Sequence, residues 1–194
     1  METKKKNTLK SFLALTLAFI MVLGVSPIGE LAGIDFAELF GLKAAAEGDA
    51  LTEGIYTYEI VDGTAQITDC DTTAAGDIVI PSELGGHPVT SIGVYAFNNC
   101  KGFTSVTIPD SVTSIGGCAF LSCESLTSVT IPDSVTSIGE YAFAGCKNLT
   151  SVKIGNDVAT IGSWAFLRCI GLKNIVIPDN VMFIGAGAFG ECMG

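Results

Sequence analysis

An Ile-Gly pair recurs through the second half of the sequence every 23 residues, with no insertion or deletion between its copies. The isoleucines of this series are Ile92, Ile115, Ile138, Ile161 and Ile184. A constant period in this range is the signature of a repeat protein in which each repeat forms one supersecondary unit. A unit this short cannot bury its own apolar side chains, so neighbouring units must stack and share a core. The period therefore predicts a solenoid.

The repeat reads S-I-G-x-Y-A-F-x-x-C-x-x-L-x-x-V-x-I-P-D-S-V-T and is clearest in residues 114–136, where Cys118 takes the Tyr position. Val129 and Ile131 alternate with polar residues, which predicts a short strand with one edge in the core. Pro132-Asp133 follows, and this pair is typical of a turn that ends a strand. Each coil is therefore expected to contribute one strand to a parallel ladder.

The other half of each coil is predicted to hold a second small strand and a short helix. The strand is expected at Val135–Ile138, and the glycine after it suggests a positive φ or a close approach to the neighbouring coil. Ala142, Phe143 and Cys146 lie three and four residues apart, the spacing of one helical face, which predicts one or two helical turns. The five phenylalanines of this segment should stack inside the solenoid: Phe97, Phe120, Phe143, Phe166 and Phe189.

These motifs carry a resemblance to a known family. The run A-F-x-x-C-x-x-L-x-x-V-x-I-P followed by V-T-S-I-G, over residues 78–194, resembles the BspA-like leucine-rich repeats (23 residues, cysteine-containing) of bacterial surface and secreted proteins. The resemblance implies an α/β repeat fold, a right-handed leucine-rich-repeat solenoid with short parallel strands and one short helix per coil. By analogy it also implies protein binding or adhesion rather than catalysis, in a secreted or cell-surface bacterial protein.

Residues 1–46 are predicted to be a secretory signal and leader segment. Lys4, Lys5, Lys6 and Lys10 precede an apolar run over residues 12–25, which is short for a transmembrane span. Cleavage is expected after the small residues at 44–46. An uncut N-terminal anchor and a retained interfacial helix are the alternatives.

Residues 47–90 are predicted to form an N-terminal β-hairpin cap and a degenerate first coil. Apolar and polar residues alternate on both sides of Asp62-Gly63, a two-residue turn signal, and extra residues around Gly85-Gly86 interrupt the coil. Residues 91–194 form the 23-residue repeats, the last of which stops before its strand. We therefore expect a fragment of a longer product or a premature gene end, with a coding sequence that continues into a strand after Gly194.

Charge and composition narrow the possible partners. The formal net charge is −10 at pH 7, which disfavours nucleic acid and anionic membranes. We expect a monomer that binds neither, with no membrane contact after signal cleavage. The column of aspartates is read as turn residues, with calcium binding as the alternative: Asp110, Asp133 and Asp179.

One cysteine per coil recurs at the repeat period. Stacked equivalent side chains point the same way and five is an odd number, so these cysteines are predicted to be buried free thiols rather than disulfides. They are Cys100, Cys123, Cys146, Cys169 and Cys192. With one histidine and no Cys-x-x-Cys pair, the sequence offers no zinc site, and we predict no cofactor.

Catalysis is not expected. His87 is the only histidine and lies in a Gly-Gly-His-Pro loop, so neither a Ser-His-Asp nor a Cys-His arrangement has a natural set of partners. The side chain of His87 is predicted to be solvated. The protein is therefore predicted not to be an enzyme.

Two exposed columns are the candidate partner contacts. Thr107, Thr130 and Lys153 are predicted to point outward from the strands, while Tyr141 and Trp164 belong to a ring column near the helical corner. Aromatic residues are the usual anchors of interfaces, although rings here can equally be packed under the next coil. We predict an interaction or adhesion module for an extracellular protein ligand. The alternative is a structural spacer that projects a missing C-terminal domain.

Overall fold

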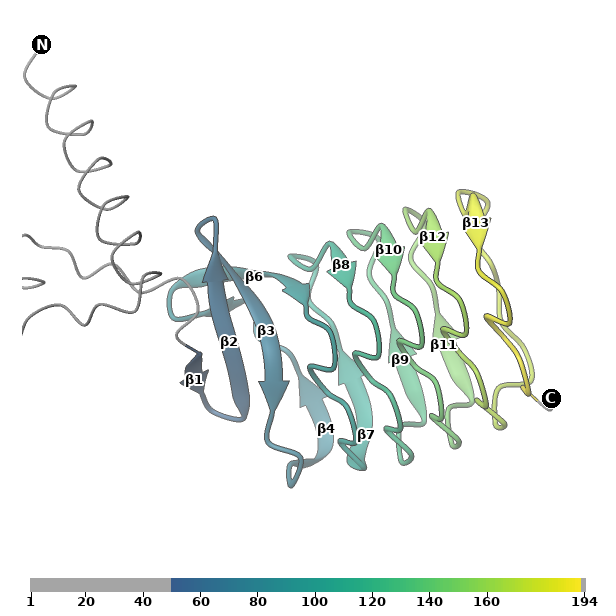
Figure 1. Ribbon diagram of the computed structural model, residues 1–194, viewed down its shortest axis with the longest axis horizontal. Helices are drawn as coiled ribbons and strands as arrows, with labels where there is room; N and C mark the ends of the chain where they lie inside the picture. The colour runs from purple at the N-terminus through teal and green to yellow at the C-terminus, as the bar shows by residue number, and fades with distance from the viewer. Residues whose placement is uncertain (1–49, 193–194) are drawn as a thin grey trace, which may run out of the picture. The chain divides into compact units, whose positions relative to one another are not determined.

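The computed structural model describes residues 50–192, so the predicted signal and leader segment at 1–46 lies outside the described residues. The described part contains strands and turns and no helix, and its coils follow one another along the solenoid (Figure 1). The strands are β1 (Leu51–Glu53), β2 (Tyr56–Val61), β3 (Thr64–Cys70), β4 (Ala75–Val79), β5 (Glu83–Leu84), β6 (His87–Ile92), β7 (Gly102–Thr107), β8 (Ser114–Ile115), β9 (Ser128–Thr130), β10 (Ser137–Ile138), β11 (Ser151–Lys153), β12 (Thr160–Ile161) and β13 (Phe183–Ile184).

Two parallel ladders run along the solenoid, as the repeat pattern predicts. One sheet orders its repeat strands β6-β8-β10-β12-β13, and the other orders them β4-β7-β9-β11. The register follows the sequence period, since Ile138 pairs with Ile115 on one side and with Ile161 on the other. In the other ladder, Val129 likewise pairs with Val106 and Val152, so equivalent residues of successive coils lie beside each other in both.

The capping hairpin is confirmed. β2 and β3 pair antiparallel around Asp62-Gly63, and both turn residues have positive φ (50° and 78°), as a two-residue hairpin requires. β1 adds a third antiparallel strand, and β3 pairs in parallel with β6. The cap thus continues directly into the first ladder. The insertion at Gly85-Gly86 is the tip of a second hairpin, formed by β5 and β6.

The core follows the predicted phenylalanine column. Phe97, Phe120, Phe143 and Phe166 are fully buried, with neighbouring ring centroids 4.9 to 5.2 Å apart and nearly parallel planes. Phe189 stacks on Phe166 at 5.4 Å and is half-buried. The core is therefore one apolar column that extends from coil to coil.

The expected short helix is wrong. In residues 141–146 the backbone N–H groups alternate between two kinds of acceptor: Ala142 and Ala144 donate within the coil, to residues three positions earlier, whereas Tyr141 and Phe143 donate to Ser163 and Ala165 of the next coil. An α-helix would need every donor for its own ladder. Here half of the donors hold neighbouring coils together, and the spacing of three and four residues arises from successive turns.

The repeat glycines have a single explanation in the structure. None of Gly93, Gly116, Gly139, Gly162 and Gly185 has a positive φ. A Cβ atom built on Gly139 would instead lie 2.5 Å from backbone atoms of Gly116 and Gly117 in the preceding coil. Close approach between coils, one of the two explanations offered from the sequence, is therefore the reason for glycine here.

The repeat cysteines have a role that the sequence does not reveal. In four of the five, Sγ donates to the carbonyl oxygen of the phenylalanine 26 residues earlier, in the preceding coil, at 3.1 to 3.2 Å. The four donors are Cys123, Cys146, Cys169 and Cys192. The thiols thus provide hydrogen-bond donors to carbonyl oxygens in the interior. They point along the solenoid, toward the preceding coil, rather than toward another sulfur.

We expect these four thiols to stay reduced. Each is committed to a carbonyl, and burial raises the pKa of Cys169 to about 12, which leaves little reactive thiolate. Alkylation after unfolding without reductant should label all four. Native-state alkylation is the control and should label the half-exposed Cys118 first. Cross-linked peptides that join two consecutive members of the column would contradict this prediction.

Candidate interaction groove on the turn face

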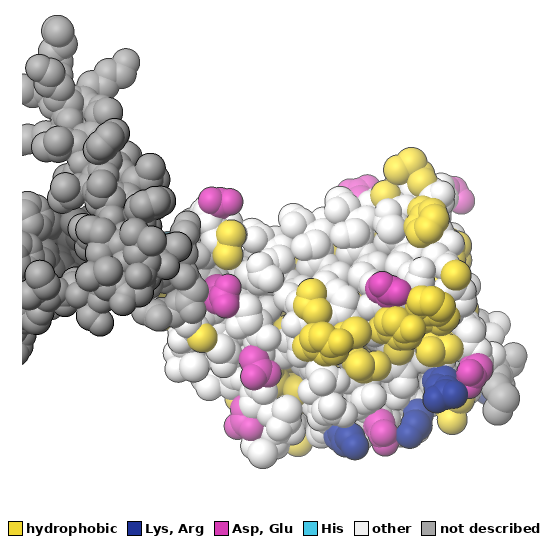
Figure 2. Space-filling model, in the orientation of Figure 1, with side chains coloured by type: hydrophobic (Ala, Val, Ile, Leu, Met, Phe, Trp, Pro, Cys, Tyr) yellow, Lys and Arg dark blue, Asp and Glu magenta, His cyan; other side chains and the backbone are white. Residues whose placement is uncertain are grey.

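A groove of about 520 Å³ runs along the turn segments of several coils. We call it the turn-face groove. It is lined by aromatic, apolar and polar residues that recur at the repeat period: Tyr95, Cys118, Leu121, Ser122, Glu124, Tyr141, Ala144, Gly145, Lys147, Leu167 and Arg168. Figure 2 shows hydrophobic side chains gathered in a band across one face of the solenoid, with basic and acidic side chains along one edge of the band.

Aromatic side chains form one wall of the groove. Tyr95 is 54% exposed, and Tyr141 is half-buried with its ring stacked on Trp164 at 5.1 Å. Cys118 lies between the two tyrosines in the column. Cys118 has a small side chain at the position where the coils before and after it have a tyrosine. No ring therefore lies between Tyr95 and Tyr141. The floor of the groove is apolar, built from Leu121, Ala144 and Leu167.

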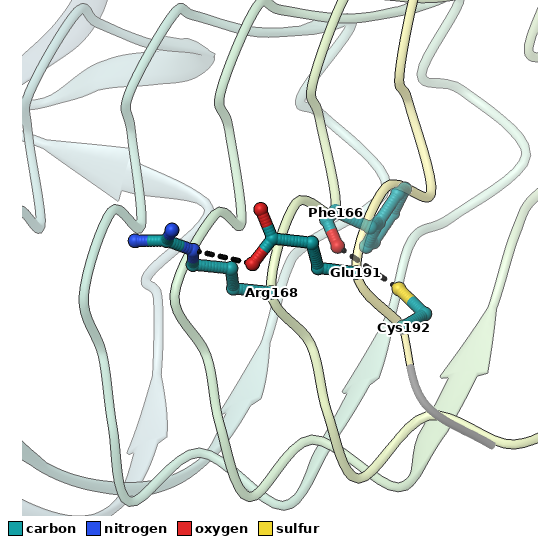
Figure 3. Close-up of polar contacts among 4 residues, drawn as sticks. All are labelled: Phe166, Arg168, Glu191 and Cys192. Carbon is teal, nitrogen blue, oxygen red and sulfur yellow. Dashed lines mark hydrogen bonds and ion pairs between the residues drawn. The ribbon is translucent and has the colours of Figure 1, made fainter.

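Paired charges lie along the groove. Lys147 Nζ lies 3.2 Å from Glu124 Oε1, and Arg168 Nε lies 2.8 Å from Glu191 Oε2 (Figure 3). Contact with Glu191 raises the pKa of Arg168, which keeps the guanidinium charged. Both pairs join neighbouring coils and are exposed, so they contribute little to stability. They give the groove a polar rim without a net charge.

The backbone beneath the groove is left-handed at two positions in each coil. One column of positive φ holds Tyr95, Cys118, Tyr141, Trp164 and Gly187, and the other holds Asn99, Ser122, Gly145, Arg168 and Glu191. Members of both columns line the groove, so the side chains at these left-handed positions lie on the surface. The repeated backbone, not a local irregularity, therefore positions the groove residues.

One tyrosine hydroxyl in the groove has a shifted pKa. Interaction with the Cys118 side chain raises the pKa of Tyr95 above the usual tyrosine value. Tyrosine is already protonated at neutral pH, so the Tyr95 hydroxyl can donate a hydrogen bond there. This polar group lies at the end of an otherwise apolar wall.

The structure divides the predicted contact residues between two surfaces. Tyr141 lines the groove and Trp164 stacks on it. Thr107, Thr130 and Lys153 are exposed at the ends of β7, β9 and β11, and none of them lines the groove. Leu121, Ala144 and Leu167 are equivalent positions, 23 residues apart in the sequence. Nothing in the sequence showed that these positions and the rings share one groove.

No arrangement typical of catalysis is found in the described residues. His87 begins β6, and its side chain is half-exposed with Nδ1 3.0 Å from the carbonyl oxygen of Gly63 in the cap turn. Within residues 50–192 no group of three or more His, Cys, Asp or Glu could hold a metal ion. The same residues contain no helix long and apolar enough to cross a membrane.

Comparison with solved structures finds leucine-rich-repeat proteins. A leucine-rich repeat protein from Bacteroides ovatus shares 33% identity with a TM-score of 0.66, over 73% of this chain and 39% of that one. A leucine rich cell surface protein from Faecalibacterium prausnitzii shares 32% identity with a TM-score of 0.53, over 77% of this chain and 54% of that one. The chain thus spans about half or less of the length of these two proteins.

A leucine rich repeat protein from T. pallidum is similar in fold alone, at 23% identity and a TM-score of 0.56, over 75% of this chain and 90% of that one. No curated protein sequence matches the chain. Residues 72–194 match, in six copies, the family described as the BspA type leucine rich repeat region. That match covers the five 23-residue repeats and reaches back into the degenerate first coil. The chain belongs to the BspA-type leucine-rich-repeat family.

Proposed function

We propose that this chain is an extracellular protein-interaction module whose partner docks in the turn-face groove. The family supports a binding role, and one of the similar structures is a leucine rich cell surface protein. Repeat solenoids offer extended surfaces on which several coils contribute side chains to one partner. The groove has this property, because residues from successive coils line it.

The observation that carries the proposal is the composition of the groove. Its wall holds Tyr95 and Tyr141, its floor is apolar, and its charged residues are paired with each other at the rim. Protein interfaces have the same arrangement: aromatic residues and arginine are enriched, charges are depleted at the centre, and the edge is polar. The strand column of Thr107, Thr130 and Lys153 is flat and lacks aromatic anchors.

The charge of the chain indicates the kind of partner. The formal net charge is −10 at pH 7, while the groove itself is close to neutral. A partner with apolar or aromatic side chains at the centre of its contact and basic residues around them would complement both features. We propose a protein ligand of this description, outside the cell.

We expect that groove variants lose the partner and strand variants keep it. The full chain is immobilised and exposed to extracellular proteins, and the captured protein is titrated against a Tyr141→Ala, Trp164→Ala double variant. Loss of two anchors should weaken binding by about 30-fold or more. Since both positions are left-handed, Leu121→Glu serves as a second variant that places a charge on the apolar floor without changing a left-handed residue.

The matched control is a Thr107→Ala, Lys153→Ala double variant on the strand column. Circular dichroism and thermal melting confirm that every variant folds. Equal binding by the two groove variants and the wild type would contradict the groove as the docking site. Absence of any captured protein would favour the structural spacer.

A further inference from the structure

We propose that Cys70 and Cys100 form a disulfide that links the N-terminal cap to the first full coil. Their Sγ atoms lie 3.3 Å apart in the interior, 30 residues apart in the sequence. Cys70 is the last residue of β3 in the cap, and Cys100 is the first member of the repeat cysteine column. A cross-link here would join the two parts of the described chain that differ most in sequence pattern.

Cys100 differs from every other member of its column. The other four thiols donate to a phenylalanine carbonyl 26 residues earlier, but the residue at that distance from Cys100 is Ala74, directly before β4. The cap brings the Cys70 sulfur to Cys100 instead. The argument that keeps equivalent thiols apart, that they point the same way, fails for this pair because the two residues are not repeat equivalents.

Only a small movement separates the two sulfurs from a bond. A disulfide is about 2.05 Å long, so the sulfurs must approach by about 1.3 Å in total. Cys100 is fully buried and Cys70 is 6% exposed, so exchange with a small disulfide takes place while the chain folds, before the pair is enclosed. Tyr56 is the partner of Cys70 in the pairing of β2 with β3. Its ring packs edge-on against Phe97, with ring centroids 6.3 Å apart, and holds the cap against the coil.

The chemistry is a two-electron oxidation by thiol–disulfide exchange with a small disulfide such as oxidised glutathione. The thiolate of one cysteine attacks the oxidant and releases one reduced thiol, and the other cysteine then attacks the mixed disulfide and releases the second. Both cysteine protons end on the two released thiols. A hydrogen bond from Cys70 lowers the pKa of Cys100, which favours Cys100 as the thiolate of the pair. Only the natural supply of an oxidant rests on the extracellular location proposed above.

Peptide masses test the cross-link directly. The reduced full chain is unfolded, refolded in the presence of oxidised glutathione, unfolded again without reductant, alkylated and cleaved with trypsin. Residues 44–101 form one tryptic peptide that holds both cysteines, because no Lys or Arg lies between Lys43 and Lys101. We expect this peptide to be two hydrogen masses lighter than its reduced form and to carry no alkyl group. Cleavage after Glu83 should leave its two halves linked until reductant is added.

Thermal melting provides a second measurement. Closing a loop of this length restricts the unfolded chain, so oxidation should raise the melting midpoint by about 10 °C relative to the reduced protein. Cys70→Ala and Cys100→Ala should each abolish both the light peptide and the shift. Cys118→Ser, at a half-exposed position of another column, is the matched control and should retain both.

Two results would overturn the proposal. One is a peptide 44–101 that carries two alkyl groups after oxidation, with an unchanged melting midpoint. The other is a link between peptides 44–101 and 102–147, which would pair Cys100 with a cysteine of a later coil. Because the melting comparison uses the wild-type chain in two redox states, it remains informative even if a cysteine variant does not fold. It also needs no binding partner, so its outcome is separate from that of the capture experiment.

Discussion

Replacing Phe143 with alanine should lower the free energy of unfolding by about 3 to 5 kcal/mol. Phe143 is fully buried at the centre of the column, with ring centroids 5.0 and 5.2 Å away on its two sides. Loss of the ring leaves a cavity that the backbone cannot close, because hydrogen bonds to the neighbouring coils fix the coil spacing. Urea unfolding followed by circular dichroism measures the change.

Phe189 provides the matched control for this substitution. Its ring is half-buried and stacks on a single neighbour, Phe166, within the described residues. Phe189→Ala should therefore cost clearly less than Phe143→Ala. Equal losses in the two variants would mean that burial in the column does not determine the stability of the coil.

Gly139→Ala should destabilise the protein by about 3 kcal/mol, near the upper end of the usual cost of overpacking. The added Cβ atom would lie 2.5 Å from backbone atoms of Gly116 and Gly117. Those atoms cannot move alone, because β8 and β10 pair directly before them, with Ser137 opposite Ser114. Thermal melting of the variant should show a lower midpoint and a normal folded spectrum at low temperature.

Gly117→Ala tests whether close approach is the cause. A Cβ atom on Gly117 would be 3.3 Å from its nearest neighbour, the carbonyl oxygen of Glu140, and Gly117 has no positive φ. This variant should lose at most about 1 kcal/mol, since a small shift relieves the contact. A Gly139→Ala protein as stable as Gly117→Ala would contradict the explanation given for the repeat glycines.

The sequence predicts the features that recur in every repeat. It misses the features that depend on a contact between two different coils, or between the cap and a coil. The ladders, the capping hairpin and the phenylalanine column follow from local pattern and period. The helix expected at 141–146 was wrong because its spacing is shared by successive turns, and the sequence does not show that Tyr141 and Phe143 donate to another coil. The spacing of apolar side chains shows which residues are buried. It does not show which carbonyl oxygens accept hydrogen bonds from the backbone N–H groups of those residues.

The candidate site shows the same division. The ring column with Tyr141 and Trp164 was identifiable from the period, and Leu121, Ala144 and Leu167 recur at the same period beside it. Their union in one groove depends on how the turns bend, which no single repeat reveals. The contact between Cys70 and Cys100 joins a residue of the cap to a residue of the repeat, so no periodic pattern could indicate it.

The two left-handed columns restrict which amino acids can diversify the groove. Side chains that branch at Cβ are strained at positive φ, whereas glycine, asparagine and unbranched side chains are tolerated better. The ten positions contain no Val, Ile or Thr: Tyr95, Cys118, Tyr141, Trp164, Gly187, Asn99, Ser122, Gly145, Arg168 and Glu191. A library built on this scaffold to select new binders should therefore randomise these sites with a reduced alphabet, and place β-branched residues only at intervening positions without a positive φ, such as 121 and 167.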